Sequence, residues 1–156
     1  MEGQLISDKK GKILDKKSYP AEGEVRVRVR YAETDQMGVV YHSNFAIWFE
    51  IGRVELMRQL GFAYRDMEER DQCRIPVADL HIRYKEPAYY DDELVVRTRL
   101  TGVHRSLLQF QYQVFRAGGD AVLAEGETTH LIVDHQLKRR SLPQKYLTAF
   151  RGVPSE

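Results

Sequence analysis

Residues 44–60 constrain the fold most strongly, because they place apolar side chains on two sides of a single predicted helix. One stripe at helical spacing consists of Phe45, Trp48, Phe49, Gly52, Leu56 and Leu60. A second, weaker stripe on the far side consists of Ile47, Ile51 and Val54. Gly61 follows at a position where glycine commonly ends a helix. A helix that is apolar on two sides predicts cover from both sides, as in a helix at the centre of a core.

Most of the remaining chain has the period-two pattern of β-strands. Val25, Val27 and Val29 alternate with three arginines, which indicates a half-buried strand with one wet, basic face. Further strands are predicted at 80–84, 93–103, 107–116 and 121–133, and a short exposed helix at 64–71. Short turns join these strands, which favours antiparallel pairing. The pattern therefore predicts an α+β domain in which an antiparallel sheet wraps one long central helix.

Composition bounds the class of protein. The 156 residues fit one domain, and 24 Lys and Arg against 23 Asp and Glu give a net charge of +1, so nothing favours nucleic-acid binding. Cys73 is the single cysteine, which excludes an internal disulfide and a Cys-cluster metal site, and we expect an inert thiol there. Apolar runs are too short for a membrane span or a secretory signal. We expect a cytoplasmic protein without a bound metal, with residues 1–23 forming a flexible N-terminal tail.

The loop between the first strand and the long helix gathers polar, titratable side chains. Asp35 lies in it, Gly38 can adopt a positive φ, and the helix that follows begins near His42 with free N–H groups. A carboxylate beside such donors can attack or hydrate an activated carbonyl, whose oxygen the donors stabilise. The same residues also fit a structural role, with Asp35 as a turn or capping residue and His42 as a histidine satisfied near a helix start.

The motif Y-x-x-x-D-x-x-G-V-V-Y-H-x-N-F, from Tyr31 to Phe45, resembles the signature of the 4-hydroxybenzoyl-CoA thioesterase family, which has the hotdog fold. Within that family the chain is most similar to the short bacterial acyl-CoA thioesterases associated with the Tol–Pal system. The resemblance covers about residues 24–147, which places a hotdog thioesterase domain at 24–150. It implies hydrolysis of an acyl-CoA thioester to the free acid and coenzyme A, with coenzyme A as part of the substrate and no separate cofactor.

The resemblance also implies roles for individual residues. Asp35 would act as nucleophile or as general base, and the backbone N–H of His42 would polarise the thioester carbonyl while its side chain positions substrate or water. Tyr31 would line the site, and Gly38 and Tyr41 would contact the substrate. Glu50, on the helix, is a competing acid in the position that another hotdog branch uses. Its simpler interpretation is a buried carboxylate paired with Arg53 or with backbone, or a dimer contact.

Basic residues are expected to bind the phosphates of coenzyme A, since arginine matches phosphate in a bidentate way. The candidates are Arg105 with Ser106 and, after the last strand, the cluster of Lys138, Arg139 and Arg140. The second cluster is equally well explained as a solvated turn. The family assembles as homodimers, often paired into homotetramers, with sites at the dimer interface. Partner residues near 74–84 would then complete the site.

Two other functions stay open at this point. One is a scaffold of lipid synthesis that binds an acyl carrier protein and hydrolyses weakly. The other is a hotdog dehydratase or hydratase, although its H-F-P-G-type motif is absent. The length and type of the acyl group cannot be read from the sequence, because Trp48, Phe49 and Phe62 fit an acyl pocket and a core equally well.

Overall fold

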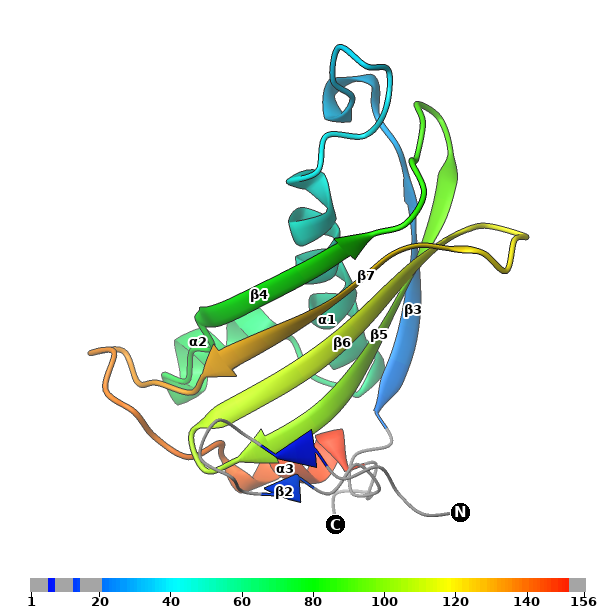
Figure 1. The fold of residues 1–156 in the computed structure, drawn as a ribbon. Helices are drawn as coiled ribbons and strands as arrows, with labels where there is room; N and C mark the ends of the chain where they lie inside the picture. Colours follow the sequence, from blue (N-terminus) through cyan, green and yellow to red (C-terminus); the bar gives the residue numbers. More distant parts are fainter. Residues whose placement is uncertain (1–5, 8–12, 15–20, 152–156) are drawn as a thin grey trace, which may run out of the picture.

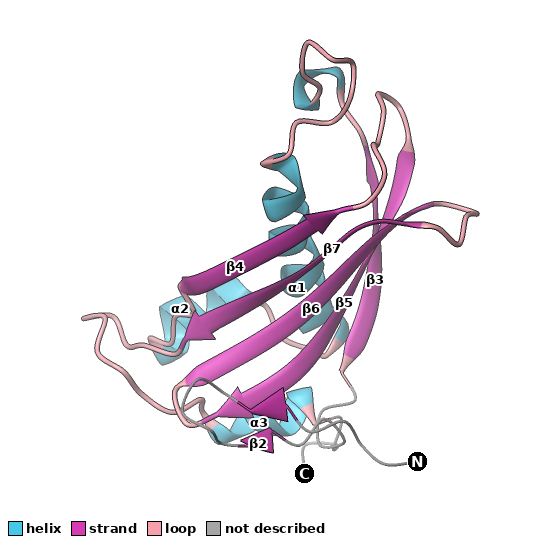
Figure 2. Ribbon diagram, in the orientation of Figure 1, coloured by secondary structure: helices cyan, strands magenta, loops and turns pink. Residues whose placement is uncertain are grey.

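The structure is a computed structural model that describes residues 6–7, 13–14 and 21–151. A five-stranded antiparallel sheet has the strand order β3-β5-β6-β7-β4, with the long helix α1 lying against one face (Figures 1 and 2). The strands of this sheet are β3 (Glu22–Arg28), β4 (Val77–Tyr84), β5 (Glu93–His104), β6 (Leu107–Arg116) and β7 (Val122–Leu131). The helices are α1 (Asn44–Gln59), α2 (Tyr64–Asp71), α3 (Gln144–Phe150) and the 3-10 turn η2 (Tyr31–Glu33). The predicted α+β class, with an antiparallel sheet around one central helix, is confirmed.

Alternation along the strands sorts side chains between the two faces of the sheet. The alternating buried positions are Leu94, Val96, Thr98 and Leu100 in β5, before the register shift at Leu100–Gly102, and Leu108, Phe110, Tyr112 and Val114 in β6. The register pairs Val96 with Val114 and Leu100 with Phe110, so the two apolar rows lie side by side and face α1. The intervening charged and amide side chains form the outer face.

α1 buries only one of its two apolar stripes. Phe45, Trp48, Phe49 and Leu56 pack into the core, whereas Ile47 is 51% exposed and Ile51 is 37% exposed. The prediction that the helix is covered from both sides is therefore wrong for the single chain. The sheet has only one inner face, which leaves the second stripe at the surface.

α3 has no counterpart among the predicted elements. Its buried side chains are Tyr146 and Phe150, and the ring of Phe62 lies 4.8 Å from Tyr146 and 5.5 Å from Phe150 between ring centroids. A seven-residue helix is too short to be stable alone, so these tertiary contacts hold it in place. α3 covers the end of the core where the β5–β6 hairpin turns (Figure 1).

Near the N-terminus, β1 (Ile6–Ser7) and β2 (Ile13–Leu14) pair antiparallel, and the main sheet begins at Glu22. The expected flexible tail at 1–23 and the domain boundary at 24 stay predictions, because most of that segment lies outside the described residues. Across the described residues, every helix is too short or too polar to cross a bilayer. The expected location stays a prediction.

Candidate active site

The loop between β3 and α1 lies at the top of the molecule in Figure 1. Asp35 lies at the base of a tight turn in this loop. The N–H of Asp35 donates to the carbonyl of Val39 at 2.9 Å, and the N–H of Gly38 donates to the carbonyl of Asp35 at 3.0 Å. Gly38 has the positive φ of 79° that its position in the sequence suggested. The carboxylate uses Oδ1 to accept from the N–H of Met37 at 2.8 Å. One carboxylate oxygen of Asp35 thus stabilises the turn. No residue in the described ranges donates a hydrogen bond to the other oxygen, Oδ2.

The backbone around His42 presents a donor at the start of α1. The N–H of His42 has no hydrogen-bond acceptor within the residues that the structure describes. Its neighbours are fixed: the carbonyl of Tyr41 accepts from the N–H of Asn44 at 3.0 Å, and the Tyr84 hydroxyl donates to the carbonyl of His42 at 2.9 Å. The 16-residue helix α1 adds the positive end of its dipole at this point. An oxygen that gains negative charge would be stabilised there.

Asp35 and His42 line the same open cleft, whose volume is about 310 Å³. The opposite wall is the chain from the end of β4 to Ala88. The lining is completed by Met37, Val39, Val40, Phe45, Tyr84, Lys85, Glu86, Pro87 and Ala88. Most of these side chains are apolar, so the cleft combines two carboxylates, of Asp35 and Glu86, and one backbone donor with an apolar floor. Burial raises the pKa of Tyr84, so its hydroxyl keeps its proton and remains a donor at neutral pH.

Three other predicted residues lie near the loop but outside this lining. Tyr31 is 78% exposed, and its ring contacts that of Tyr90 in an edge-to-face arrangement, with centroids 5.7 Å apart. The prediction that Tyr31 lines the site is therefore not met within one chain. Tyr41 lies closer, with its ring centroid 4.3 Å from that of His42. Glu50 is exposed on α1 and does not line the cleft, so the interpretation of a buried carboxylate is wrong, whereas that of a dimer contact stays a prediction.

The predicted phosphate-binding residues lie at the other end of the sheet (Figure 1). Arg105 and Ser106 form the β5–β6 turn, whereas the first residue of β5, Glu93, pairs with Arg28 next to the loop that holds Asp35. The 12 residues of β5 span about 40 Å between these points. Lys138 and Arg139 lie in an exposed turn after β7, at the same far end. A single chain does not bring these basic residues to its own cleft.

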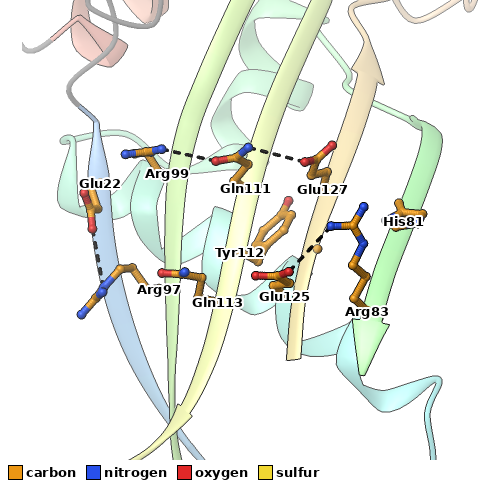
Figure 3. A pocket seen from close by; sticks show the side chains of 11 residues that line it. Glu22, His81, Arg83, Arg97, Arg99, Gln111, Tyr112, Gln113, Glu125 and Glu127 are labelled. Carbon is orange, nitrogen blue, oxygen red and sulfur yellow. Dashed lines mark hydrogen bonds and ion pairs between the residues drawn. The ribbon is translucent and has the colours of Figure 1, made fainter. Parts of the chain in front are cut away.

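A larger hollow, of about 380 Å³, lies on the outer face of the sheet and is strongly polar (Figure 3). Its side chains pair with one another across the strands: Arg97 with Glu22 at 3.5 Å, Arg99 with Gln111 at 3.3 Å, Gln111 with Glu127 at 3.5 Å and Arg83 with Glu125 at 3.8 Å. Exposed pairs of this kind make a solvated face that contributes little to stability. The cleft beside Asp35 is therefore the better candidate for chemistry.

Sequence reasoning missed the second wall of the cleft and one buried acid. The segment 84–88 joins the cleft only through the sheet order, for which the local sequence has no signal. The strand pattern does not mark Glu33 as buried, because β3 ends at Arg28, Glu33 lies in η2, and the odd-numbered Tyr31 between them is exposed. Cys73 is fully buried and burial raises the pKa of its thiol, which agrees with the expected inert cysteine.

Comparison with known proteins places the chain in a family. A profile of the Thioesterase-like superfamily matches residues 29–150. The putative acyl-CoA thioesterase YneP of Bacillus subtilis is 38% identical over 110 residues, which is 70% of this chain and 78% of that protein. The acyl-CoA thioester hydrolase YbgC of Escherichia coli O6:H1 is 30% identical over 126 residues, covering 80% of this chain and 92% of that protein.

Solved structures agree with these relatives. A DHNA-CoA thioesterase from Staphylococcus aureus superimposes with a TM-score of 0.78 at 31% identity, covering 84% of this chain and 89% of that chain. The chain is thus related to known thioesterases over most of its length, and it has a sheet with a helix against its inner face. We conclude that it belongs to the Thioesterase-like superfamily with the hotdog fold.

Proposed function

We propose that this protein hydrolyses acyl-CoA thioesters, with Asp35 as its catalytic carboxylate and the N–H of His42 as its oxyanion donor. Membership of the superfamily and the acyl-CoA thioesterase names of its relatives support the activity. One observation carries the assignment of residues. Asp35 and His42 line one cleft at the start of α1. Within the described chain, Oδ2 of Asp35 accepts no hydrogen bond, and the N–H of His42 has no acceptor.

The chemistry follows from these two groups. The thioester carbonyl oxygen accepts a hydrogen bond from His42 N–H, which stabilises the negative charge that develops on it. Asp35 then acts in one of two ways. As general base it takes a proton from water, and the water oxygen attacks the carbonyl carbon. As nucleophile it attacks directly and forms an anhydride that water hydrolyses. Either route breaks the carbon–sulfur bond and releases the free acid and the coenzyme A thiol.

The apolar floor suits the acyl part of the substrate. Met37, Val39 and Phe45 line it from the loop and from α1, and Pro87 lines it from the opposite wall. An acyl or aryl group placed there would lose contact with water, and this burial favours binding. The cleft is open along one side, so further walls can come from a second chain.

A homodimer formed along β4 would supply such a wall. β4 is an edge strand of the sheet and exposes Val77, Leu80 and Tyr84, while Ile47 and Ile51 are exposed on α1. An open edge with apolar side chains is a typical site for pairing with another strand. If β4 pairs antiparallel with β4 of a second chain, the sheet of the second chain runs in the opposite direction to that of the first. This brings the end that carries Arg105 and Lys138 toward the cleft of the other chain, where they would meet the phosphates of coenzyme A.

Asp35→Asn tests the proposed chemistry. We expect thioester hydrolysis, followed as free thiol release from a panel of short, long and aromatic acyl-CoA substrates, to fall at least about 10²-fold with the fold intact. Glu50→Gln is the matched control, since it removes an exposed carboxylate of α1 outside the cleft. Retained turnover in Asp35→Asn, or a comparable loss in Glu50→Gln, would transfer the catalytic role to another acid.

A further inference from the structure

Glu33 is a buried acid at the root of the catalytic loop. The residue is 5% exposed, and it is the one acidic residue that is buried in the described part of the chain. One carboxylate oxygen accepts from the N–H of Arg30 at 2.8 Å, and the other accepts from the indole N–H of Trp48 at 3.1 Å. The carboxylate therefore ties the end of β3 to the second turn of α1.

The backbone carbonyl of Glu33 holds the end of the loop and the start of α1 through hydrogen bonds. Its carbonyl oxygen accepts from the N–H of Tyr41 at 2.8 Å and from the side-chain amide of Asn44 at 2.9 Å. The N–H of Glu33 also donates to the carbonyl of Arg30 at 3.0 Å. Five hydrogen bonds thus meet at Glu33 and join the segment after β3, the loop and α1. A buried carboxylate is costly unless it is fully bonded, so these contacts also fix where the residue lies.

We propose that Glu33 is a positioning residue, which sets the separation between the Asp35 carboxylate and the N–H of His42. This inference rests on the proposed function. Asp35 follows Glu33 by two residues, and His42 follows Tyr41, whose N–H is bound to the Glu33 carbonyl. Both reacting groups are therefore one or two residues from atoms that Glu33 holds. A displacement of about 1 Å between such groups can cost about 10²-fold in rate.

Glu33→Gln keeps the shape of the side chain but removes its charge and one of its two acceptors. We expect kcat to fall about 10-fold to 10²-fold with KM nearly unchanged, because the substrate-binding walls stay in place. The chain contains one tryptophan, and it is Trp48, so its emission spectrum reports directly on the carboxylate beside the indole. We expect that spectrum to shift in the variant.

Thr128→Val is the matched control for loss of a buried hydrogen bond, since Thr128 is buried and bonded to Tyr112 and His130 instead of to the loop. It should lower stability and leave kcat and the Trp48 spectrum unchanged. Asn44→Ala, which removes a bond to the Glu33 carbonyl from a half-buried position, provides a second test if Glu33→Gln does not fold. It should lower kcat in the same way.

An unchanged kcat in a folded Glu33→Gln protein whose Trp48 emission has shifted would overturn the inference, as would an unchanged kcat in Asn44→Ala. Failure of the proposed function looks different. In that case the wild-type protein releases no thiol from any acyl-CoA, or Asp35→Asn remains active while Glu33→Gln still loses kcat.

Discussion

At the scale of single residues, His130 shows how the core accommodates a titratable group. It is fully buried, with Nδ1 2.8 Å from the carbonyl of Ile75 and Nε2 2.8 Å from the Thr128 hydroxyl, which in turn lies 2.6 Å from the hydroxyl of Tyr112. A carbonyl only accepts, so Nδ1 carries the hydrogen and Nε2 accepts. Burial, opposed by the bond to Ile75 and assisted by the charge of Arg53, lowers the pKa of His130 to about 4. The ring is neutral at pH 7.

This pKa predicts acid destabilisation. The unfolded histidine has a pKa near 6.5, so between pH 6.5 and 4 the unfolded chain binds a proton that the folded chain does not. The contribution of neutral His130 to the free energy of unfolding is fully present above pH 6.5 and is lost as pH falls to 4. The loss amounts to about 3 kcal/mol. The measurement is urea unfolding at several pH values for the wild type and for His130→Gln. Equal pH dependence in the two proteins would contradict the prediction.

At the scale of elements, the contact between α1 and the sheet depends on Gly52. A Cβ at this position would lie 2.3 Å from Oγ1 of Thr98 and 3.1 Å from Cγ1 of Val96, so the helix can approach the sheet only because glycine has no side chain. Thr98 is buried, and its hydroxyl has no hydrogen-bond partner within the described residues. The crowded hydroxyl and the bare glycine face each other across the interface.

Gly52→Ala sets helix propensity against packing. Alanine favours the helix by about 1 kcal/mol, but overpacking a core typically costs about 1–3 kcal/mol, and a β-branched side chain such as Thr98 has little freedom to move. We expect net destabilisation, measured by urea unfolding. Thr98→Ala in the same chain removes the clashing oxygen and should restore most of the loss. A Gly52→Ala protein as stable as the wild type would show that the helix can shift outward at no cost.

Elements with a regular period could be predicted from the sequence, whereas elements held by tertiary contacts could not. The helix at 64–71 and the strand at 107–116 occupy the predicted residues. α3 was missed because Tyr146 and Phe150 gain their stability from Phe62, far away in the sequence. The exposed Ile47 looked like core for a similar reason: helical spacing shows that a face is apolar but not what covers it.

At the scale of the whole molecule, the sequence motif predicts which residues of the loop before α1 lie together, but not the rest of the proposed site. Asp35, Gly38 and His42 are close in sequence, so a local motif can predict their proximity. Lys138 and Arg139 were assigned to the same site from their charge alone, and charge contains no information on distance. The long strands place them at the far end of the sheet (Figure 1). Only an assembly of two chains would bring the two halves of such a site together.

Leu80→Asp tests whether β4 forms that assembly. Leu80 is 44% exposed on this edge strand, so aspartate is tolerated in the single chain, while a dimer about a twofold axis would bury two charges. A dimer can bury only the exposed 44% of each leucine, so losing this burial on both chains removes about 1–3 kcal/mol and weakens the dimer by about 10-fold to 10²-fold, before the cost of the two charges. We expect light scattering to detect a monomer and thiol release to fall with it, because the cleft then lacks the wall that the partner chain would add. Leu80→Met keeps an apolar side chain at the same position and should remain dimeric and active. If the Leu80→Asp protein is monomeric and retains full turnover, the site is complete within one chain, and the basic residues at the far end of the sheet have no part in it.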